Sequence, residues 1–178
     1  MRFVDIVAKL NTIIKNKIMY KEIQGDLIQL ALAGEFDVVT HGCNCQCNMG
    51  AGIAPQMAKA FGCDRFDLEN EKLKGVIQKL GNIDFKSVAI GVNKTITVVN
   101  SYTQFNYGKN HIDGTSKPLD YEALTLCMRK INYVFKGKHI GLPKIGAGLA
   151  GGDWDRIKQI IQTELKDCDV TVVIYNKD

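Results

Sequence analysis

The stretch LPKIGAGLAGGDW, residues 142–154, decides how the rest of the chain is interpreted. An apolar run over residues 140–145 leads into it and predicts a buried strand, and residues 153–165 follow it with helical spacing. Four glycines lie between. Glycine lets the backbone come close to a ligand, successive N–H groups form an anion-binding concavity, and a helix N-terminus adds partial positive charge. We therefore expect this loop to bind a phosphate group.

A second glycine loop lies earlier in the chain, in the stretch THGCNCQCNMGAGIA, residues 40–54. An apolar run over residues 36–40 precedes it, and a helix is expected over residues 53–61. Asn44 can both donate to and accept from a sugar hydroxyl, and His41 is either an acid or base or a residue that orients the loop. Neither loop has the Walker lysine pattern, which disfavours P-loop NTPases.

Strands and helices alternate along the rest of the chain, which predicts a three-layer α/β domain with a mixed, largely parallel sheet. Ligands of such sheets bind beyond the carboxyl ends of the strands, where both glycine loops should lie. We assign residues 19–178 to this domain and residues 1–18 to an amphipathic N-terminal helical extension, a packing element or a partner-binding helix. Further strands are expected at 19–24, 87–92, 95–100 and 170–175, helices at 27–33, 69–80 and 120–135, a tight hairpin at 93–94, and a long functional loop at 103–117.

Composition narrows the functional classes for this chain of 178 residues. The net charge of +4 favours anionic ligands slightly, but the lysines are scattered, so nucleic-acid binding is not indicated. Cys43, Cys45 and Cys47 are separated by single residues, a poor spacing for zinc, and we expect neither a metal site nor a disulfide framework. With no targeting segment and no apolar run of about 20 residues, we expect a cytoplasmic protein outside the membrane.

The two glycine loops, in this order and in this strand–helix frame, resemble those of a macrodomain, the ADP-ribose-binding module. The resemblance runs from about Tyr20 to Tyr175 and includes residues 24–27 (QGDL), 50–54 (GAGIA) and 143–149 (PKIGAGL). Within the superfamily, residues 41–45 (HGCNC) and 148–154 (GLAGGDW) look most like the ADP-ribose-1″-phosphate phosphatases of yeast and phage type. These are similar to the terminal ADP-ribose protein glycohydrolases.

The resemblance implies a binding site along the carboxyl edge of the sheet. Asp26 would accept a hydrogen bond from the adenine amino group, although it is also a natural N-cap for residues 27–33. Asn44 would contact the distal ribose, Tyr175 or Asn176 would flank the adenine, and the two loops would hold the diphosphate. The implied ligand-binding residues are Asp26, Leu27, Asn44, Gly50, Ala51, Gly52, Ile53, Lys144, Ile145, Gly146, Ala147, Gly148, Leu149, Ala150 and Tyr175.

The glycohydrolase branch uses a lysine nucleophile and an acidic residue in the second loop. Ala150 stands where the resemblance places that acid, and no lysine is found near Ser101 and Tyr102, where the nucleophile is expected. A covalent route through lysine is therefore disfavoured. Hydrolysis of a phosphate monoester needs instead an oriented water and hydrogen-bond donors for the phosphoryl charge.

The candidate catalytic residues for this hydrolysis are His41, Asn44 and Asp153. Asp153 is equally well explained as the N-cap of the helix that follows it. His111 and Asp113, in the long polar loop, are further acid or base candidates.

We expect a monomeric phosphatase that converts ADP-ribose-1″-phosphate into ADP-ribose and phosphate without a cofactor or an obligatory metal. The alternatives are a non-catalytic reader of ADP-ribose or of ADP-ribosylated protein, and an ADP-ribosyl-protein hydrolase. Release of phosphate would separate the enzyme from the reader.

Overall fold

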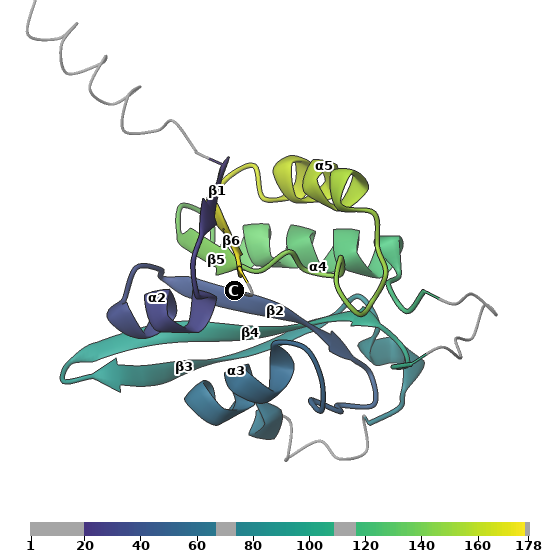
Figure 1. The fold of residues 1–178 in the computed structure, drawn as a ribbon, viewed down its shortest axis with the longest axis horizontal. Helices are drawn as coiled ribbons and strands as arrows, with labels where there is room; N and C mark the ends of the chain where they lie inside the picture. Colours follow the sequence, from purple (N-terminus) through teal and green to yellow (C-terminus); the bar gives the residue numbers. More distant parts are fainter. Residues whose placement is uncertain (1–19, 67–73, 109–116, 177–178) are drawn as a thin grey trace, which may run out of the picture.

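A computed structural model of the chain describes residues 20–66, 74–108 and 117–176. Its strands form one sheet in the order β1-β6-β5-β2-β4-β3. All neighbouring strands are parallel except β3, which is antiparallel to β4 (Figure 1). This confirms the mixed, largely parallel sheet. The strands are β1 (Tyr20–Gln24), β2 (Val38–Asn44), β3 (Ile83–Gly91), β4 (Lys94–Gln104), β5 (His139–Leu142) and β6 (Asp169–Ile174).

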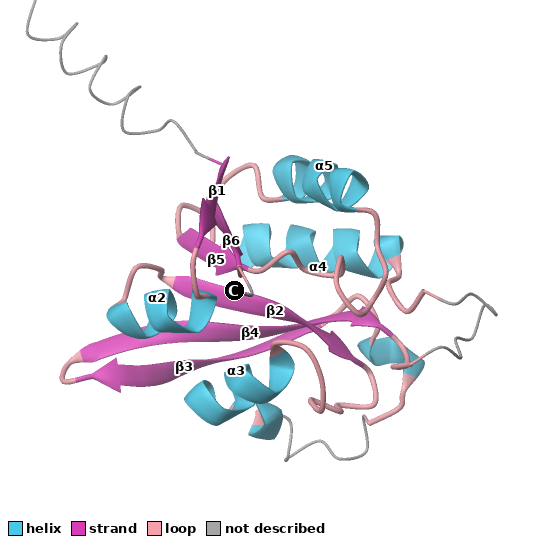
Figure 2. Cartoon of the chain, viewed as in Figure 1, coloured by secondary structure: helices cyan, strands magenta, loops and turns pink. Residues whose placement is uncertain are grey.

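Helices cover both faces of this sheet, which confirms the three-layer architecture (Figure 2). On one face, α2 (Leu27–Ala33) and α3 (Ala54–Phe61) pack on the sheet through a core that includes Met57. On the other, α4 (Tyr121–Val134) and α5 (Trp154–Glu164) bury Met128 and Ile157 against β5 and β6. Two single turns of 3-10 helix, η1 (Cys63–Arg65) and η3 (Ile77–Lys79), complete the described elements.

Three aspartates fix where helices begin. The side chains of Asp26, Asp120 and Asp153 each accept a hydrogen bond from a backbone N–H in the first turn of α2, α4 and α5. These N–H groups have no partner inside the helix, so the carboxylates stabilise both the start of the helix and its positive end. The predicted helices over 27–33, 53–61, 120–135 and 153–165 are confirmed to within one residue at each end.

The predicted helix over 69–80 is wrong in its described part. Residues 69–73 lie outside the described residues, and residues 77–79 form only a 3-10 turn. Gly75 has a φ of +69°, and Val76 is extended at φ −94° and ψ 131°, so neither can continue a helix. The backbone N–H of Gly75 donates instead to Cys45 O.

Three strands extend beyond their predicted ranges. One is β3, which begins at Ile83, paired with Ser101 of β4, rather than at residue 87. Polar residues continue β2 to Asn44 and β4 to Gln104, because these strands remain paired with each other in parallel over this distance. The apolar run over 140–145 forms strand only to Leu142, before Pro143. The predicted extension over 1–18 and residues 109–116 of the long polar loop, including His111 and Asp113, lie outside the described residues.

No helix in the described part of the chain is long and apolar enough to cross a membrane.

Candidate functional site

The two glycine loops meet at the carboxyl edge of the sheet. We call residues 45–53, after β2, loop one, and residues 143–153, after β5, loop two (Figure 1). A Cβ atom built on Gly52 would lie 3.7 Å from Leu149 Cδ1, and one built on Gly42 would lie 3.4 Å from Ile145 Cγ1. Loop two therefore lies over the end of β2 and contacts loop one.

Loop one is held by its own asparagines. Asn44 Nδ2 donates to Asn48 O at 2.8 Å, and Asn48 N donates to Asn44 Oδ1 at 3.1 Å. Asn48 Oδ1 accepts from Gly50 N at 2.9 Å, so this N–H is occupied within the loop. The N–H groups at positions 51–53 make no hydrogen bond within the described residues. They are free to bind an anion, as the sequence predicts for this segment.

Loop two is anchored by two buried side chains, Ile145 and Ala150. Gly152 N donates to Gly146 O at 2.8 Å and closes the loop at its base. The N–H groups at positions 148–150 have no partner among the residues that the structure describes. Loop two therefore offers a second run of three backbone donors beside that of loop one.

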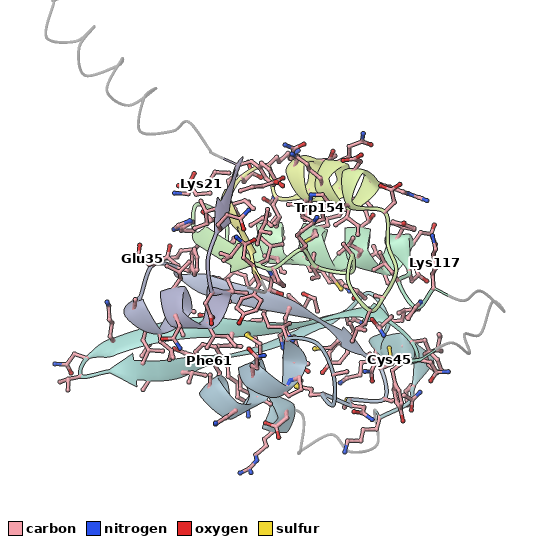
Figure 3. All side chains as sticks on the ribbon, viewed as in Figure 1. Lys21, Glu35, Cys45, Phe61, Lys117 and Trp154 are labelled. Atoms are coloured by element: carbon pink, nitrogen blue, oxygen red, sulfur yellow. The ribbon has the colours of Figure 1, made fainter. Side chains whose placement is uncertain are left out.

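The predicted contacts of Lys144 and Leu149 fall on exposed parts of loop two. Lys144 Nζ lies 5.1 Å from the centre of the Trp154 ring, so this lysine points toward the start of α5. Leu149 is 75% exposed and covers Gly52. In Figure 3, Cys45 at the start of loop one lies at the same side of the molecule as Lys117, whose side chain packs near Gly151 of loop two.

The residues predicted to hold adenine lie together at the carboxyl ends of β1 and β6. The hydrogen bond from Gly25 N to Ile174 O, 3.0 Å long, keeps the start of α2 beside Tyr175, which is 65% exposed. Asp26 Oδ1 accepts from Ile28 N at 2.9 Å and from Gln29 N at 3.1 Å. This confirms Asp26 as the N-cap and leaves its second oxygen for a ligand. The side chain of Leu27 is buried, so only its backbone can take part.

Asp153 sits where loop two ends and α5 begins. Its Oδ1 accepts from Arg156 N at 3.2 Å, and its own N–H donates to the Tyr121 hydroxyl at 2.8 Å. The N-cap alternative is therefore confirmed. Because Asp153 is exposed and Oδ2 has no hydrogen bond within the described chain, the carboxylate can also act on a ligand or a water.

His41 lies inside the protein, with an exposed fraction of 0%. Its Nε2 is 2.8 Å from Asn100 Oδ1 and 3.6 Å from Cys63 Sγ. Burial lowers the pKa of His41 to about 4, so the ring is neutral at pH 7. In this position His41 does not reach a ligand, and the geometry favours the alternative that it orients the end of β2.

Asn100 is a residue of this region that the sequence analysis did not identify. Its Nδ2 donates to Asp84 Oδ1 at 2.8 Å and to Cys63 O at 2.9 Å, so its oxygen is left to accept from His41 Nε2–H. The amide thus fixes both the position and the tautomer of the ring. Only the pairing of His41 with Asn100 across β2 and β4 brings these groups together.

The cysteines are free thiols in the structure. Burial raises the pKa of the thiols at Cys43, Cys45, Cys63, Cys127 and Cys168, which disfavours the reactive thiolate. The described residues include no group of three or more His, Cys, Asp or Glu side chains that could hold a metal ion.

Comparison with known proteins supplies one sequence relative and many structural ones. No protein-family model matches the chain. The chain is 35% identical over 160 residues to an uncharacterized 17.5 kDa protein in the tk-vs intergenic region of enterobacteria phage T4, covering 86% of this chain and 94% of the phage protein.

Among solved structures, the macrodomain of Thermus aquaticus DarG superposes with a TM-score of 0.63 at 22% identity, covering 89% of this chain and 99% of that one. Thermosipho africanus DarTG, solved in complex with ADP-ribose, superposes with a TM-score of 0.64 at 16% identity. That match covers 86% of this chain and 40% of DarTG. These two likenesses establish the fold of the chain.

Proposed function

Since this chain belongs to the same protein family as the phage T4 17.5 kDa protein and has the macrodomain fold, we propose that it binds ADP-ribose between loop one and loop two. We propose further that it hydrolyses ADP-ribose-1″-phosphate to ADP-ribose and phosphate. The DarTG structure supports the first part, because a protein of this fold is solved there in complex with ADP-ribose.

The observation that carries the proposal is the pair of unpaired donor runs in two loops that contact each other. Residues 51–53 and 148–150 each offer three consecutive N–H groups without a partner in the described structure, and the contact between Leu149 and Gly52 holds the two loops together. A diphosphate has oxygens on two neighbouring phosphorus atoms and can accept from both runs. Hydrogen bonds to an ionised acceptor are the stronger kind, so this arrangement suits an anionic ligand.

In the proposed reaction, a water attacks the terminal phosphorus, and the bond between phosphorus and the 1″ oxygen breaks. Asp153 Oδ2 orients this water and accepts its proton, and the departing 1″ oxygen takes a proton from solvent. Asn44 holds the distal ribose, and the backbone donors of loop two bind the phosphoryl charge as it develops. His41 contributes by positioning the end of β2 rather than by touching the ligand.

Ala150 supports phosphate release over removal of ADP-ribose from protein side chains. Ala150 is buried, at 8% exposed, and has no carboxylate. Residues 101–108, which include the end of β4 and the segment directly after it, contain no lysine. The groups needed for a covalent route through lysine are thus missing from both places.

A non-catalytic ADP-ribose reader is the second candidate, and the burial of His41 favours it, because one of the candidate catalytic groups does not reach the ligand. The purified chain should be tested for phosphate release from ADP-ribose-1″-phosphate and, by calorimetry, for binding of ADP-ribose. A mock preparation from cells that lack the gene, purified identically, controls for a contaminating phosphatase. Turnover by the wild type alone supports the enzyme, and binding without turnover supports the reader. Release of ADP-ribose from a glutamate-modified protein would support a hydrolase of protein-linked ADP-ribose instead.

A further inference from the structure

Thr103, at the carboxyl end of β4, carries an unpaired hydroxyl inside the protein. The residue is 1% exposed, and Thr103 Oγ1 is the one buried side-chain oxygen or nitrogen of the described residues that has no hydrogen-bond partner. Buried hydroxyls are normally paired, because an unpaired one loses its hydrogen bonds to water without replacement. A single exception of this kind calls for an explanation.

A bulge places this hydroxyl. In the pairing of β2 with β4, Cys43 is opposite Tyr102 and Asn44 is opposite Gln104, so Thr103 is an extra residue without a partner in the register. Bulges of this kind redirect a side chain and are frequent beside active sites.

A glycine lies close to the hydroxyl. A Cβ atom built on Gly42 would lie 3.0 Å from Thr103 Oγ1 and 3.4 Å from Ile145 Cγ1. The hydroxyl therefore lies beside the end of β2 and close to Ile145, which anchors loop two.

Thr40 shows what a purely structural threonine looks like at this sheet. It precedes Gly42 by two residues on the same strand, and it is fully buried. Its Oγ1 donates to Val99 O at 3.1 Å and lies 2.8 Å from Ser101 Oγ. One threonine is thus satisfied within the fold, and the other is not.

We propose that Thr103 is a ligand-binding residue whose hydroxyl forms a hydrogen bond with the distal ribose or its phosphate, reached when the Ile145 side chain moves aside. This inference rests on the proposed binding of ADP-ribose and adds a recognition group to that site. The hydroxyl gains on binding the partner that it lacks in the free protein, so it contributes to affinity rather than to folding.

The test compares Thr103→Val, Thr103→Ser and Thr40→Val with the wild type. Affinity for ADP-ribose is measured by calorimetry, and the midpoint of thermal unfolding is measured without ligand. Thr103→Val should bind about fivefold to tenfold more weakly, the effect of one lost hydrogen bond, and should unfold at a midpoint no lower than that of the wild type. Thr103→Ser keeps the hydroxyl and should restore most of the affinity. Thr40→Val should lower the unfolding midpoint and leave the affinity unchanged.

Equal affinities of Thr103→Val and the wild type would overturn the inference and leave the proposed function standing. A wild-type protein that does not bind ADP-ribose would overturn the proposed function, and the inference with it.

Discussion

Asn44 and Asn48 hold each other through two reciprocal hydrogen bonds, Asn44 Nδ2 to Asn48 O at 2.8 Å and Asn48 N to Asn44 Oδ1 at 3.1 Å. The pair closes loop one where it leaves β2. An amide oxygen can accept two hydrogen bonds and an amide nitrogen can donate two, so Asn44 keeps one of each for a ligand. One side chain can thus both shape loop one and contact a sugar.

Replacement of Asn44 by alanine should therefore weaken ADP-ribose binding by more than the loss of a single contact. Both loop hydrogen bonds disappear together with the contact to the ribose, and we expect an affinity at least about tenfold lower by calorimetry. Asn132→Ala is the matched control, because the Asn132 side chain also makes two hydrogen bonds, donating to Asp167 Oδ2 and accepting from Asp167 N, but lies outside both loops. An affinity of Asn44→Ala equal to that of this control would contradict the placement of the ligand.

Substitutions at two glycines of loop two should change different properties, the affinity for ADP-ribose at Gly148 and the stability of the fold at Gly152. A Cβ on Gly148 would meet nothing within 4 Å, whereas one on Gly152 would lie 2.8 Å from Gly146 O, a backbone atom that cannot move aside cheaply. Gly148→Ala should leave the unfolding midpoint unchanged and lower the affinity for ADP-ribose, because the methyl group occupies the proposed diphosphate site. Gly152→Ala should destabilise the fold by about 1–3 kcal/mol, as overpacking does.

Calorimetry and thermal unfolding of both variants check this contrast. If Gly148→Ala binds ADP-ribose as well as the wild type does, loop two does not hold the diphosphate.

The Asp153→Asn variant separates the two roles of Asp153. Asparagine is as good an N-cap as aspartate, so the hydrogen bond from Arg156 N and the stability of α5 should be kept. The amide cannot accept a proton from water, and we expect phosphate release to fall by about 10²-fold or more. Steady-state kinetics and an unfolding curve measure both effects. Full activity in a stable Asp153→Asn protein would leave Asp153 with only its role as a cap.

Structural features that depend on neighbours in the sequence were predicted better than features that depend on contacts between distant residues. The caps at Asp26 and Asp153 and the two glycine loops depend on neighbours within a few residues, and their positions were predicted correctly. The ends of β2 and β4 were not, because their polar residues become strand only through pairing with each other. The burial of His41 has the same origin, since Asn100 and Cys63 come from distant parts of the chain. The role of Asn48 in holding loop one was not predicted, although a local signal existed, because this asparagine follows Asn44 by four residues in a turn.

The neutral, buried His41 should make the stability of the protein depend on pH. Its pKa is about 4 in the folded protein, lowered by burial, and near 6.5 in the unfolded chain. Between these values the unfolded chain binds more protons, so this residue's contribution to the unfolding free energy falls as the pH is lowered from about 6.5 toward 4. Between pH 7 and pH 4.5 the loss is about 2 kcal/mol.

His41→Gln removes this dependence, because glutamine does not titrate and can still donate to Asn100 Oδ1. Urea unfolding of the wild type and of His41→Gln at pH 7 and pH 4.5 measures the effect. The other acidic and thiol groups, including Asp84 and Cys63 around the ring, are common to both proteins and cancel in the difference. We expect the stability of the wild type relative to the variant to fall by about 2 kcal/mol on acidification. A constant difference between the two proteins would mean that His41 has the same pKa in the folded and unfolded states. That result would contradict the prediction that burial lowers the pKa of this residue.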